Sequence, residues 1–286
     1  MTTWLDETLH PGLRAGLEAD RILYDSETEH QRLVIFENRL FGRVMMLDGV
    51  TQTTEADEFI YHEMLTHLPI LAHGAVQRVL IIGGGDGGTA EEALKHQTLE
   101  HVTMVEIDAT VVELAKQHLP SICGDAFNDP RLDLVIADGV AFVADHQGPG
   151  YDLIIIDSTD PVGPGEVLFT PAFYEGCKRC LNEGGVLVTQ NGVPFLQAGE
   201  LRDTMATFKG LFADATCYLA TVPTYVGGPM AFGWGTDNPA IRQTPVEVVA
   251  QRLTETDLAL RYFRPGLQLA AFVLPGYIEA LVNPGN

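Results

Sequence analysis

The sequence predicts an α/β protein in which a doubly wound parallel sheet follows a small β-rich segment. From about residue 76, short apolar runs typical of strands buried on both faces alternate with helical stretches. Before residue 54, short apolar stretches lack helical spacing and lead into a hairpin signal, Asp48-Gly49. We therefore divide the chain into an N-terminal β-strand domain, residues 1–53, and an α/β domain, residues 54–286.

The N-terminal elements are short. Strands are expected at residues 21–24, 33–36 and 44–47, which are mostly apolar. A helix should follow, because Thr54 resembles an N-cap with an acidic residue three positions on, and apolar residues then recur at helical spacing. Pro69 is expected to mark the end of this helix.

The α/β domain is expected to contain five strands separated by helices. Ligands of such sheets bind at the carboxyl ends of the strands, so the residues that follow each strand are candidates for a site. The strands are expected at residues 79–82, 102–105, 134–136, 153–156 and 185–189, and the helices at 89–96, 109–118 and 171–181.

Composition excludes several classes of protein. With 46% hydrophobic and 20% charged residues, the chain can bury a core and is not disordered. Apolar runs are too short for a membrane span, and the first residues do not resemble a secretory signal. The four cysteines are too few for a disulfide framework, so we expect a cytoplasmic protein.

The net charge of −22 argues against partners that are themselves anionic. Nucleic acid and anionic lipid are bound by Lys and Arg side chains that neutralise phosphates, and neither partner is expected. The acidity either serves solubility alone or attracts a cationic substrate. The positions of the carboxylates must decide between these interpretations.

Acidic residues follow each of the first four predicted strands. Acids are common in loops, but four in succession at the ligand-binding edge indicate a functional cleft. The fifth strand ends at Gln190 instead. The acids are Asp86, Glu106 with Asp108, Asp138, and Asp157 with Asp160.

A glycine-rich loop follows the first strand. Gly83, Gly85 and Gly88 fit G-x-G-x-x-G, and Glu106 lies 21 residues after Gly85, where an acid can accept hydrogen bonds from both ribose hydroxyls. This arrangement indicates a nucleoside site. The alternative is a tight turn without a ligand.

The charge of this loop narrows the choice of nucleoside. Asp86 would place a carboxylate beside a pyrophosphate, and no Arg or Lys lies between Arg78 and Lys95, so an NAD-type ligand is disfavoured. A cationic nucleoside without phosphate, such as an S-adenosyl sulfonium, fits better. The same argument favours an ammonium over a carboxylate at its other end, and Asp138-Gly139 suits the adenine amino group.

A second pair of carboxylates follows the fourth strand. Asp157 and Asp160 lie in a loop rich in proline and glycine that can close over a substrate. Together they can hold an ammonium and accept a proton. For either residue, an Asx-turn that closes the strand is the structural alternative.

Together with the other motifs given below, these residues closely resemble those of the bacterial spermidine synthases, which are polyamine aminopropyltransferases. The resemblance runs from about Trp4 to Leu274 and implies a small N-terminal β-domain on a methyltransferase-like Rossmann domain. It also implies a homodimer that transfers an aminopropyl group from decarboxylated S-adenosylmethionine, a co-substrate rather than a cofactor, to putrescine. The motifs that carry it are residues 52–55, 57–63, 83–88, 105–108, 157–164 and 223–225.

The resemblance also assigns roles by position. Asp157 matches the general base, and Asp86 and Asp160 match amine ligands, with Asp86 on the ammonium of the donor. One departure is visible: the chain has Thr89-Ala90-Glu91-Glu92 where relatives have a Leu-Arg-Glu pattern, and we expect it to alter an ion pair on the helix surface rather than the site. The other matching positions are Tyr61, His62, Gln190 and Tyr225 for substrate, and Gln31, Gln52, Gly83, Gly85, Glu106, Asp138, Gly139, Ser158 and Pro164 for the donor.

Metal binding is not expected. His62 and His67 are five residues apart and do not share a helix face as H-E-x-x-H requires, and Cys177 and Cys180 have no second pair to complete a zinc site. Three alternatives stay open at this stage. They are the same chemistry on cadaverine or agmatine, an NAD-dependent oxidoreductase, and a binding protein without turnover.

Overall fold

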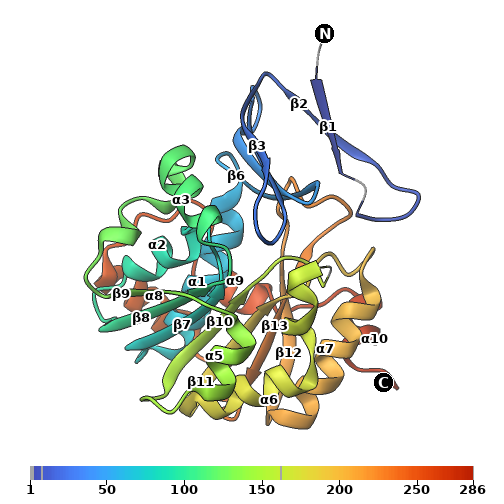
Figure 1. The fold of residues 1–286 in the computed structure, drawn as a ribbon. Coiled ribbons are helices and arrows are strands. Elements are labelled where there is room, and N and C mark those ends of the chain that lie inside the picture. Colours follow the sequence, from blue (N-terminus) through green and yellow to red (C-terminus); the bar gives the residue numbers. More distant parts are fainter. Residues whose placement is uncertain (1–2, 8, 162, 286) are drawn as a thin grey trace.

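The computed structural model describes residues 3–7, 9–161 and 163–285, without the side chains of residues 163 and 164. Its N-terminal part forms two antiparallel sheets, which lie above the α/β part in Figure 1. The three strands expected here are confirmed, and Asp48 and Gly49 form the turn after the third, with φ of 48° and 77°. The sheets are β1 (Thr3–Glu7) with β2 (Ala15–Ala19), and β3 (Arg21–Glu27), β4 (Arg32–Asn38), β5 (Gly42–Leu47) and β6 (Val50–Thr54).

The central sheet has seven strands in the order β12-β13-β11-β10-β7-β8-β9. The five strands that the sequence predicts, β7 to β11, are parallel, whereas β13 runs antiparallel to both neighbours and makes the sheet mixed. The strands are β7 (Arg78–Gly83), β8 (His101–Glu106), β9 (Leu132–Ile136), β10 (Tyr151–Asp157), β11 (Leu181–Gln190), β12 (Asp214–Ala220) and β13 (Met230–Thr236).

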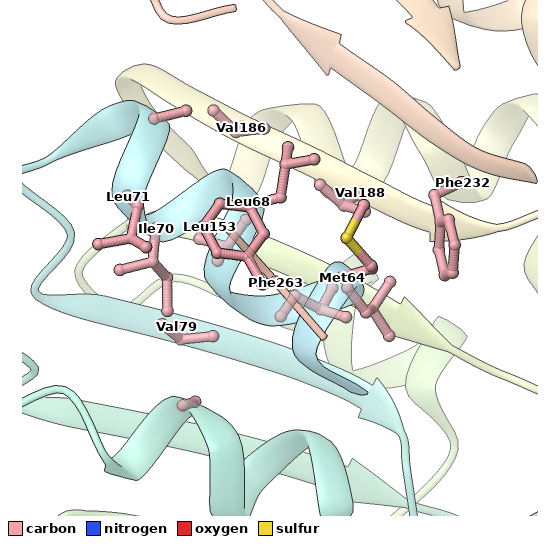
Figure 2. Close-up of a cluster of buried hydrophobic side chains, with 14 of the residues drawn as sticks. Met64, Leu68, Ile70, Leu71, Val79, Leu153, Val186, Val188, Phe232 and Phe263 are labelled. Atoms are coloured by element: carbon pink, nitrogen blue, oxygen red, sulfur yellow. The ribbon is translucent and has the colours of Figure 1, made fainter. Parts of the chain in front are cut away.

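Helices cover both faces of the central sheet, because successive strand residues are apolar and point to opposite sides. On β7, Val79 and Ile81 belong to the core cluster beneath α1 (Glu58–His73), α2 (Gly88–Leu94) and α8 (Val246–Thr256), part of which Figure 2 shows. Leu80 and Ile82 belong to the cluster on the other face. That face is covered by α5 (Gly139–Asp145), α6 (Pro171–Cys180), α7 (Ala198–Leu211) and α10 (Gly276–Val282).

Helix α1 differs from its prediction. It begins after Asp57 and continues through Pro69 to His73, so the expected end at Pro69 is wrong. Proline removes one backbone hydrogen bond from a helix interior, but the turns around it are buried in the core and packing outweighs that loss. The helix ends at Gly74, which adopts a φ of 76° and donates its N–H to the carbonyl of Ile70.

The N-terminal sheet is packed onto the α/β part through α3 (Ala109–His118) and α4 (Pro120–Cys123). Apolar side chains of β4 and β5 share one buried cluster with these helices. Thr28 adds a hydrogen bond of 2.7 Å from its hydroxyl to Asp108, the N-cap of α3. The β-strands are thereby held over the carboxyl end of β8.

The remaining elements are η1 (Ala126–Asn128), η2 (Gly163–Phe169) and α9 (Leu267–Ala270).

In the described part of the chain, none of the helices combines the length and apolar character needed to cross a membrane.

Candidate active site

A cavity of about 170 Å³ lies at the carboxyl ends of β7, β8, β10 and β11. Met45, Leu47 and Thr51 of the N-terminal strands line its other side, so both parts of the chain form it. Most of the residues singled out from the sequence line this cavity: Gln31, Gln52, Tyr61, His62, Gly83, Gly85, Asp86, Glu106, Asp157, Ser158, Asp160, Gln190 and Tyr225.

The glycine loop after β7 allows the strand ends to approach one another. Gly83 has a φ of 85°, and a Cβ there would lie 2.1 Å from the carbonyl oxygen of Asp157. A Cβ on Gly84 would lie 2.8 Å from Oδ2 of Asp157, and one on Gly85 would lie 2.8 Å from Oε2 of Glu106. Gly83 is therefore required by its backbone conformation and by its close approach to the Asp157 carbonyl, and Gly84 and Gly85 leave room for the carboxylates of Asp157 and Glu106.

Asp157, the last residue of β10, accepts hydrogen bonds on both carboxylate oxygens. The Tyr61 hydroxyl donates to Oδ1 at 2.6 Å, and the Thr89 hydroxyl donates to Oδ2 at 2.6 Å. Burial raises the pKa of Asp157 above its usual range, and the negative charge of Asp86 raises it further. His62 and the two hydroxyls act in the opposite direction.

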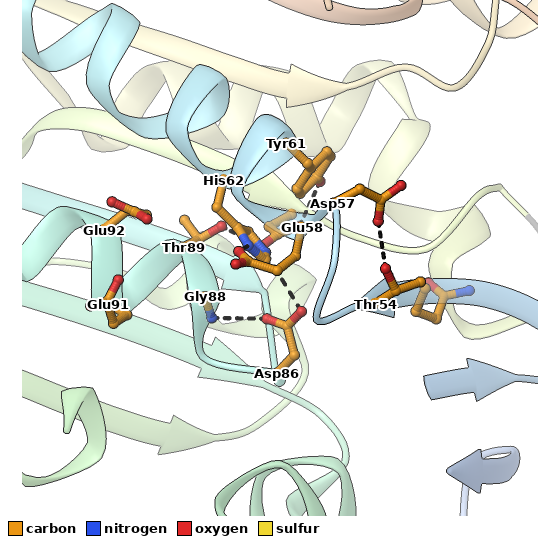
Figure 3. Close-up of polar contacts among 12 residues, drawn as sticks. Thr54, Asp57, Glu58, Tyr61, His62, Asp86, Gly88, Thr89, Glu91 and Glu92 are labelled. Carbon is orange, nitrogen blue, oxygen red and sulfur yellow. Dashed lines mark hydrogen bonds and ion pairs between the residues drawn. The ribbon is translucent and has the colours of Figure 1, made fainter. Parts of the chain in front are cut away.

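His62 lies between two carboxylates (Figure 3). Its Nδ1 is 2.7 Å from Oε2 of Glu58, and its Nε2 is 3.5 Å from Oδ2 of Asp86. Burial alone would lower the pKa of His62, but Asp86 and Glu58 outweigh it and raise the pKa well above the usual value. Burial would likewise raise the pKa of Asp86, whereas the charge of His62 holds it below its usual range. Each of the two groups therefore favours the ionised form of the other.

Gly88 fixes the carboxylate of Asp86. Its backbone N–H donates to Oδ1 of Asp86 at 2.9 Å, and its missing Cβ would lie 2.2 Å from the ring of His62. One ligand atom each of His62, Asp86 and Asp157 lies within 4.8 Å of the others, but only the neutral form of His62 offers a lone pair to a metal ion. Carboxylates can bind a substrate ammonium as well as a metal ion, so the expectation of no metal stays a prediction.

Glu106, the last residue of β8, is nearly buried. Its Oε1 accepts the backbone N–H of Asp108 at 2.8 Å, and Oε2 lies beside the glycine loop. Burial raises the pKa of Glu106 to about 7. Such a carboxylate is well placed to accept hydrogen bonds from a ligand, which would return its pKa toward the usual range. Gln31 lines the same side of the cavity.

The other end of the cavity contains a second acidic group. Gln197, near the start of α7, donates from Nε2 to Oδ1 of Asp160 at 2.5 Å and to Oε2 of Glu200 at 3.2 Å. Burial raises the pKa of Asp160, and burial together with the charge of Asp160 raises the pKa of Glu200 to about 8. Tyr225 donates its hydroxyl to the carbonyl oxygen of Gln52.

Three of the expected donor residues are not seen in the cavity wall. Asp138 is exposed and caps α5, accepting the N–H of Val140 at 2.7 Å, and Gly139 begins that helix. Pro164 belongs to η2, but its side chain lies outside the described residues. The expected contacts of Asp138 and Gly139 with adenine, and of Pro164 with the donor, stay predictions. Ser158, in contrast, lines the cavity, and its buried hydroxyl has no partner among the described residues.

Sequence reasoning missed Glu58, Thr89 and Gln197. The pair Glu58 and His62 has the i,i+4 spacing of neighbours on one helix face, which could have identified it. Gln197 contacts Asp160 across 37 residues of sequence, and no local pattern indicates that contact.

Residues 89–92, where the sequence departs from the expected pattern, contact both the helix surface and the site. Glu91 and Glu92 pair with Lys95 at 2.8 and 2.7 Å, and the expected change of ion pair relative to relatives stays a prediction. Thr89, however, is fully buried and contacts Asp157 directly. This segment therefore reaches the site through Thr89, which the expectation did not include.

Comparison with known proteins identifies the family. Residues 58–245 match the model described as spermine/spermidine synthase domain, and residues 3–55 match the spermidine synthase tetramerisation domain. The chain belongs to the spermidine synthase family of polyamine aminopropyltransferases. It is accordingly a transferase of polyamine biosynthesis, and the match of its N-terminal part indicates an oligomer.

Relatives cover nearly the whole chain. It is 58% identical to polyamine aminopropyltransferase 1 of Pseudomonas aeruginosa over 272 residues, 95% of each chain. It is 56% identical to the polyamine aminopropyltransferase of a Ruegeria strain over 278 residues, 97% of this chain and 98% of the relative. The spermidine synthase of Thermotoga maritima has a TM-score of 0.89 at 33% identity, covering 98% of this chain and 94% of that one.

A spermidine synthase in complex with the transition-state analogue AdoDATO has a TM-score of 0.92 at 35% identity, with the same coverage. These matches confirm the predicted fold class and the predicted enzyme class. The oxidoreductase and the non-catalytic binding protein are thereby set aside as alternatives.

Proposed function

We propose that the cavity transfers the aminopropyl group of decarboxylated S-adenosylmethionine to putrescine, giving spermidine and 5′-methylthioadenosine. The observation that carries this proposal is the position of Asp157, whose carboxylate shares one cavity with Asp86 and Glu106. A proton acceptor, an ammonium ligand and a ribose ligand are thus available to one bound pair of substrates.

The acceptor must lose a proton to react. A primary amine with a pKa of about 10 is mostly protonated at neutral pH and has no free electron pair. We assign Asp157 as the general base that accepts this proton. The amine nitrogen then attacks the carbon next to the sulfonium. A C–N bond forms, the C–S bond breaks, and its electron pair passes to sulfur, which leaves as a neutral thioether.

The other residues hold the reactants in line. Asp86 binds the ammonium of the aminopropyl group, and Asp160 binds the acceptor amine in a channel lined by Tyr61, Gln190 and Tyr225. Glu106 accepts the ribose hydroxyls. Positioning of this kind can supply a large part of the rate enhancement, because the sulfonium is already a good leaving group. His62 is assigned to the substrate site beside Asp86. The remaining donor contacts are assigned to Gln31, Gln52, Gly83, Gly85, Asp138, Gly139, Ser158 and Pro164.

Another acceptor, such as cadaverine or agmatine, is the alternative within the same chemistry. The test is to incubate the purified protein with decarboxylated S-adenosylmethionine and a panel of diamines, and to quantify products by mass spectrometry. Spermidine formed fastest from putrescine supports the proposal. A faster reaction with another amine would replace the acceptor, and the absence of methylthioadenosine with every amine would overturn the reaction.

We further propose a homo-oligomer of the cytoplasm with the domain division at residues 53 and 54. The sequence led us to expect a homodimer, and the match of residues 3–55 to a tetramerisation domain supports a dimer of dimers as the larger unit. Light scattering at several concentrations distinguishes the two states. A monomer at all concentrations would contradict both.

A further inference from the structure

Thr89 makes a contact that the family assignment does not explain. It lies in the first turn of α2 and is fully buried. Its hydroxyl donates to Oδ2 of Asp157 at 2.6 Å, across 68 residues of sequence, while Tyr61 donates to Oδ1 from α1. The carboxylate of Asp157 therefore accepts one hydroxyl from each of two helices.

Helix α2 is held firmly enough to fix this contact. The buried His67 of α1 bonds through Nε2 to Glu92 of α2 at 2.8 Å and through Nδ1 to His96 at 2.8 Å. Lys95 pairs with Glu92 on the outer side. The two helices that carry Tyr61 and Thr89 are therefore joined by a buried polar network, and the two hydroxyls are presented from fixed elements.

We propose that Thr89 is a positioning residue for aminopropyl transfer, which together with Tyr61 clamps the carboxylate of Asp157 in one orientation. A carboxylate offers about four lone pairs, and this clamp occupies one on each oxygen. The remaining lone pairs then face the cavity, where the acceptor nitrogen arrives. The inference rests on the proposed role of Asp157 as general base.

The same contact favours the ionised carboxylate. Burial and the charge of Asp86 raise the pKa of Asp157, and a protonated base accepts no proton, whereas hydrogen bonds to the charged form counteract this rise. The other titratable groups around Asp157 are His62 and Tyr61 of α1, Glu106 at the end of β8, and Tyr225 in the loop after β12. Both tyrosines have raised pKa values and stay neutral.

The test replaces the hydroxyl and keeps the shape. Thr89→Val should lower kcat/KM about ten- to a hundredfold, because a hydrogen bond to a charged group is lost. It should also move the acid limb of the kcat/KM profile upward by about one pH unit, because the pKa of Asp157 rises. Thr89→Ser keeps the hydroxyl and should leave both kcat/KM and the acid limb of its pH profile close to those of the wild type. Thr66→Val is the matched control: Thr66 is buried in α1, and its hydroxyl has no partner among the described residues.

A double-mutant cycle separates positioning from general damage. In an Asp157→Asn background, Thr89→Val should cause no further loss, since it acts only through Asp157. An equal loss in both backgrounds, or an unchanged pH profile in Thr89→Val, would overturn the inference while leaving the base assignment intact. Near-normal turnover of Asp157→Asn alone would instead overturn the base assignment.

Discussion

Glu106 makes the affinity for the donor depend on pH. Its pKa is raised from the usual 4.5 to about 7 by burial. A ribose that donates hydrogen bonds to this carboxylate requires the ionised form. Donor binding is therefore linked to loss of a proton by Glu106, and affinity should fall as the pH falls through 7.

The magnitude follows from the two pKa values. A rise from 4.5 to about 7 corresponds to about 3 kcal/mol of preference for the protonated form in the free protein. With a pKa of about 7, Glu106 in the free protein is about nine-tenths ionised at pH 8 and about one-tenth ionised at pH 6. In the complex, ribose hydroxyls that restore the ordinary pKa keep Glu106 ionised at both pH values. The dissociation constant should then increase about tenfold between these pH values.

The assay is calorimetric titration with 5′-methylthioadenosine between pH 5.5 and 8.5. This product carries the ribose and adenine but no amine, so the titration of a substrate ammonium does not enter. Glu106→Gln should bind it more weakly at pH 8 and with a flat pH profile, because its amide does not titrate. Asp157→Asn should retain the slope but move it to slightly lower pH, because the charge of Asp157 contributes to the raised pKa of Glu106.

Two results would refute this reasoning. A wild-type affinity that is flat from pH 6 to 8 would mean that Glu106 is ionised without ligand or does not meet the ribose. A slope that persists in Glu106→Gln would assign the proton to another group.

Three further predictions concern catalysis and the glycine loop. Asp157→Asn should lower kcat by roughly 10²–10⁴-fold in a product assay, the usual range for a general base, and near-normal turnover would contradict the assignment. Asp86→Asn should weaken binding of decarboxylated S-adenosylmethionine about ten- to a hundredfold in calorimetry, because an ammonium contact is lost, but leave methylthioadenosine nearly unaffected; equal losses would argue against an ammonium ligand. Gly83→Ala should cost about 2 kcal/mol or more in urea denaturation, since its Cβ would lie 2.1 Å from the Asp157 carbonyl, whereas Gly210→Ala, with no atom within 4 Å, should be neutral or stabilising. Similar stability of the two alanine variants would show that the loop tolerates a side chain.

The sequence predicted the parallel part of the sheet because its strands are continuous apolar runs such as residues 79–82 and 153–156. It did not predict β13, in which Gly233 and Gly235 interrupt the apolar pattern. Those glycines make room for Thr189 and Phe212, a reason that only the packed neighbours reveal. Pro69 led to a wrong helix end, because burial of α1 outweighs the local signal that a proline gives.

The acids of the site could be predicted because each one ends a strand or follows it closely, and parallel strands end at one edge. Contacts between distant helices could not. Thr89 and Gln197 meet their carboxylates only after α2 and α7 are packed, and neither residue type signals such a contact. The acids that carry the chemistry could therefore be found in the sequence, whereas the residues that hydrogen-bond to those acids could not.

The acidic groups at both ends of the cavity have a consequence for the order in which the products leave. With Asp86 on the aminopropyl ammonium of the donor and Asp160 on the amino group of the acceptor that does not react, each substrate has one ammonium at one of these acids. After transfer, the same two ammonium groups are the ends of a single spermidine molecule, which bridges both anchors, whereas methylthioadenosine has lost its positive charge. Departure of spermidine breaks both ion pairs, and until it leaves neither substrate can take its place.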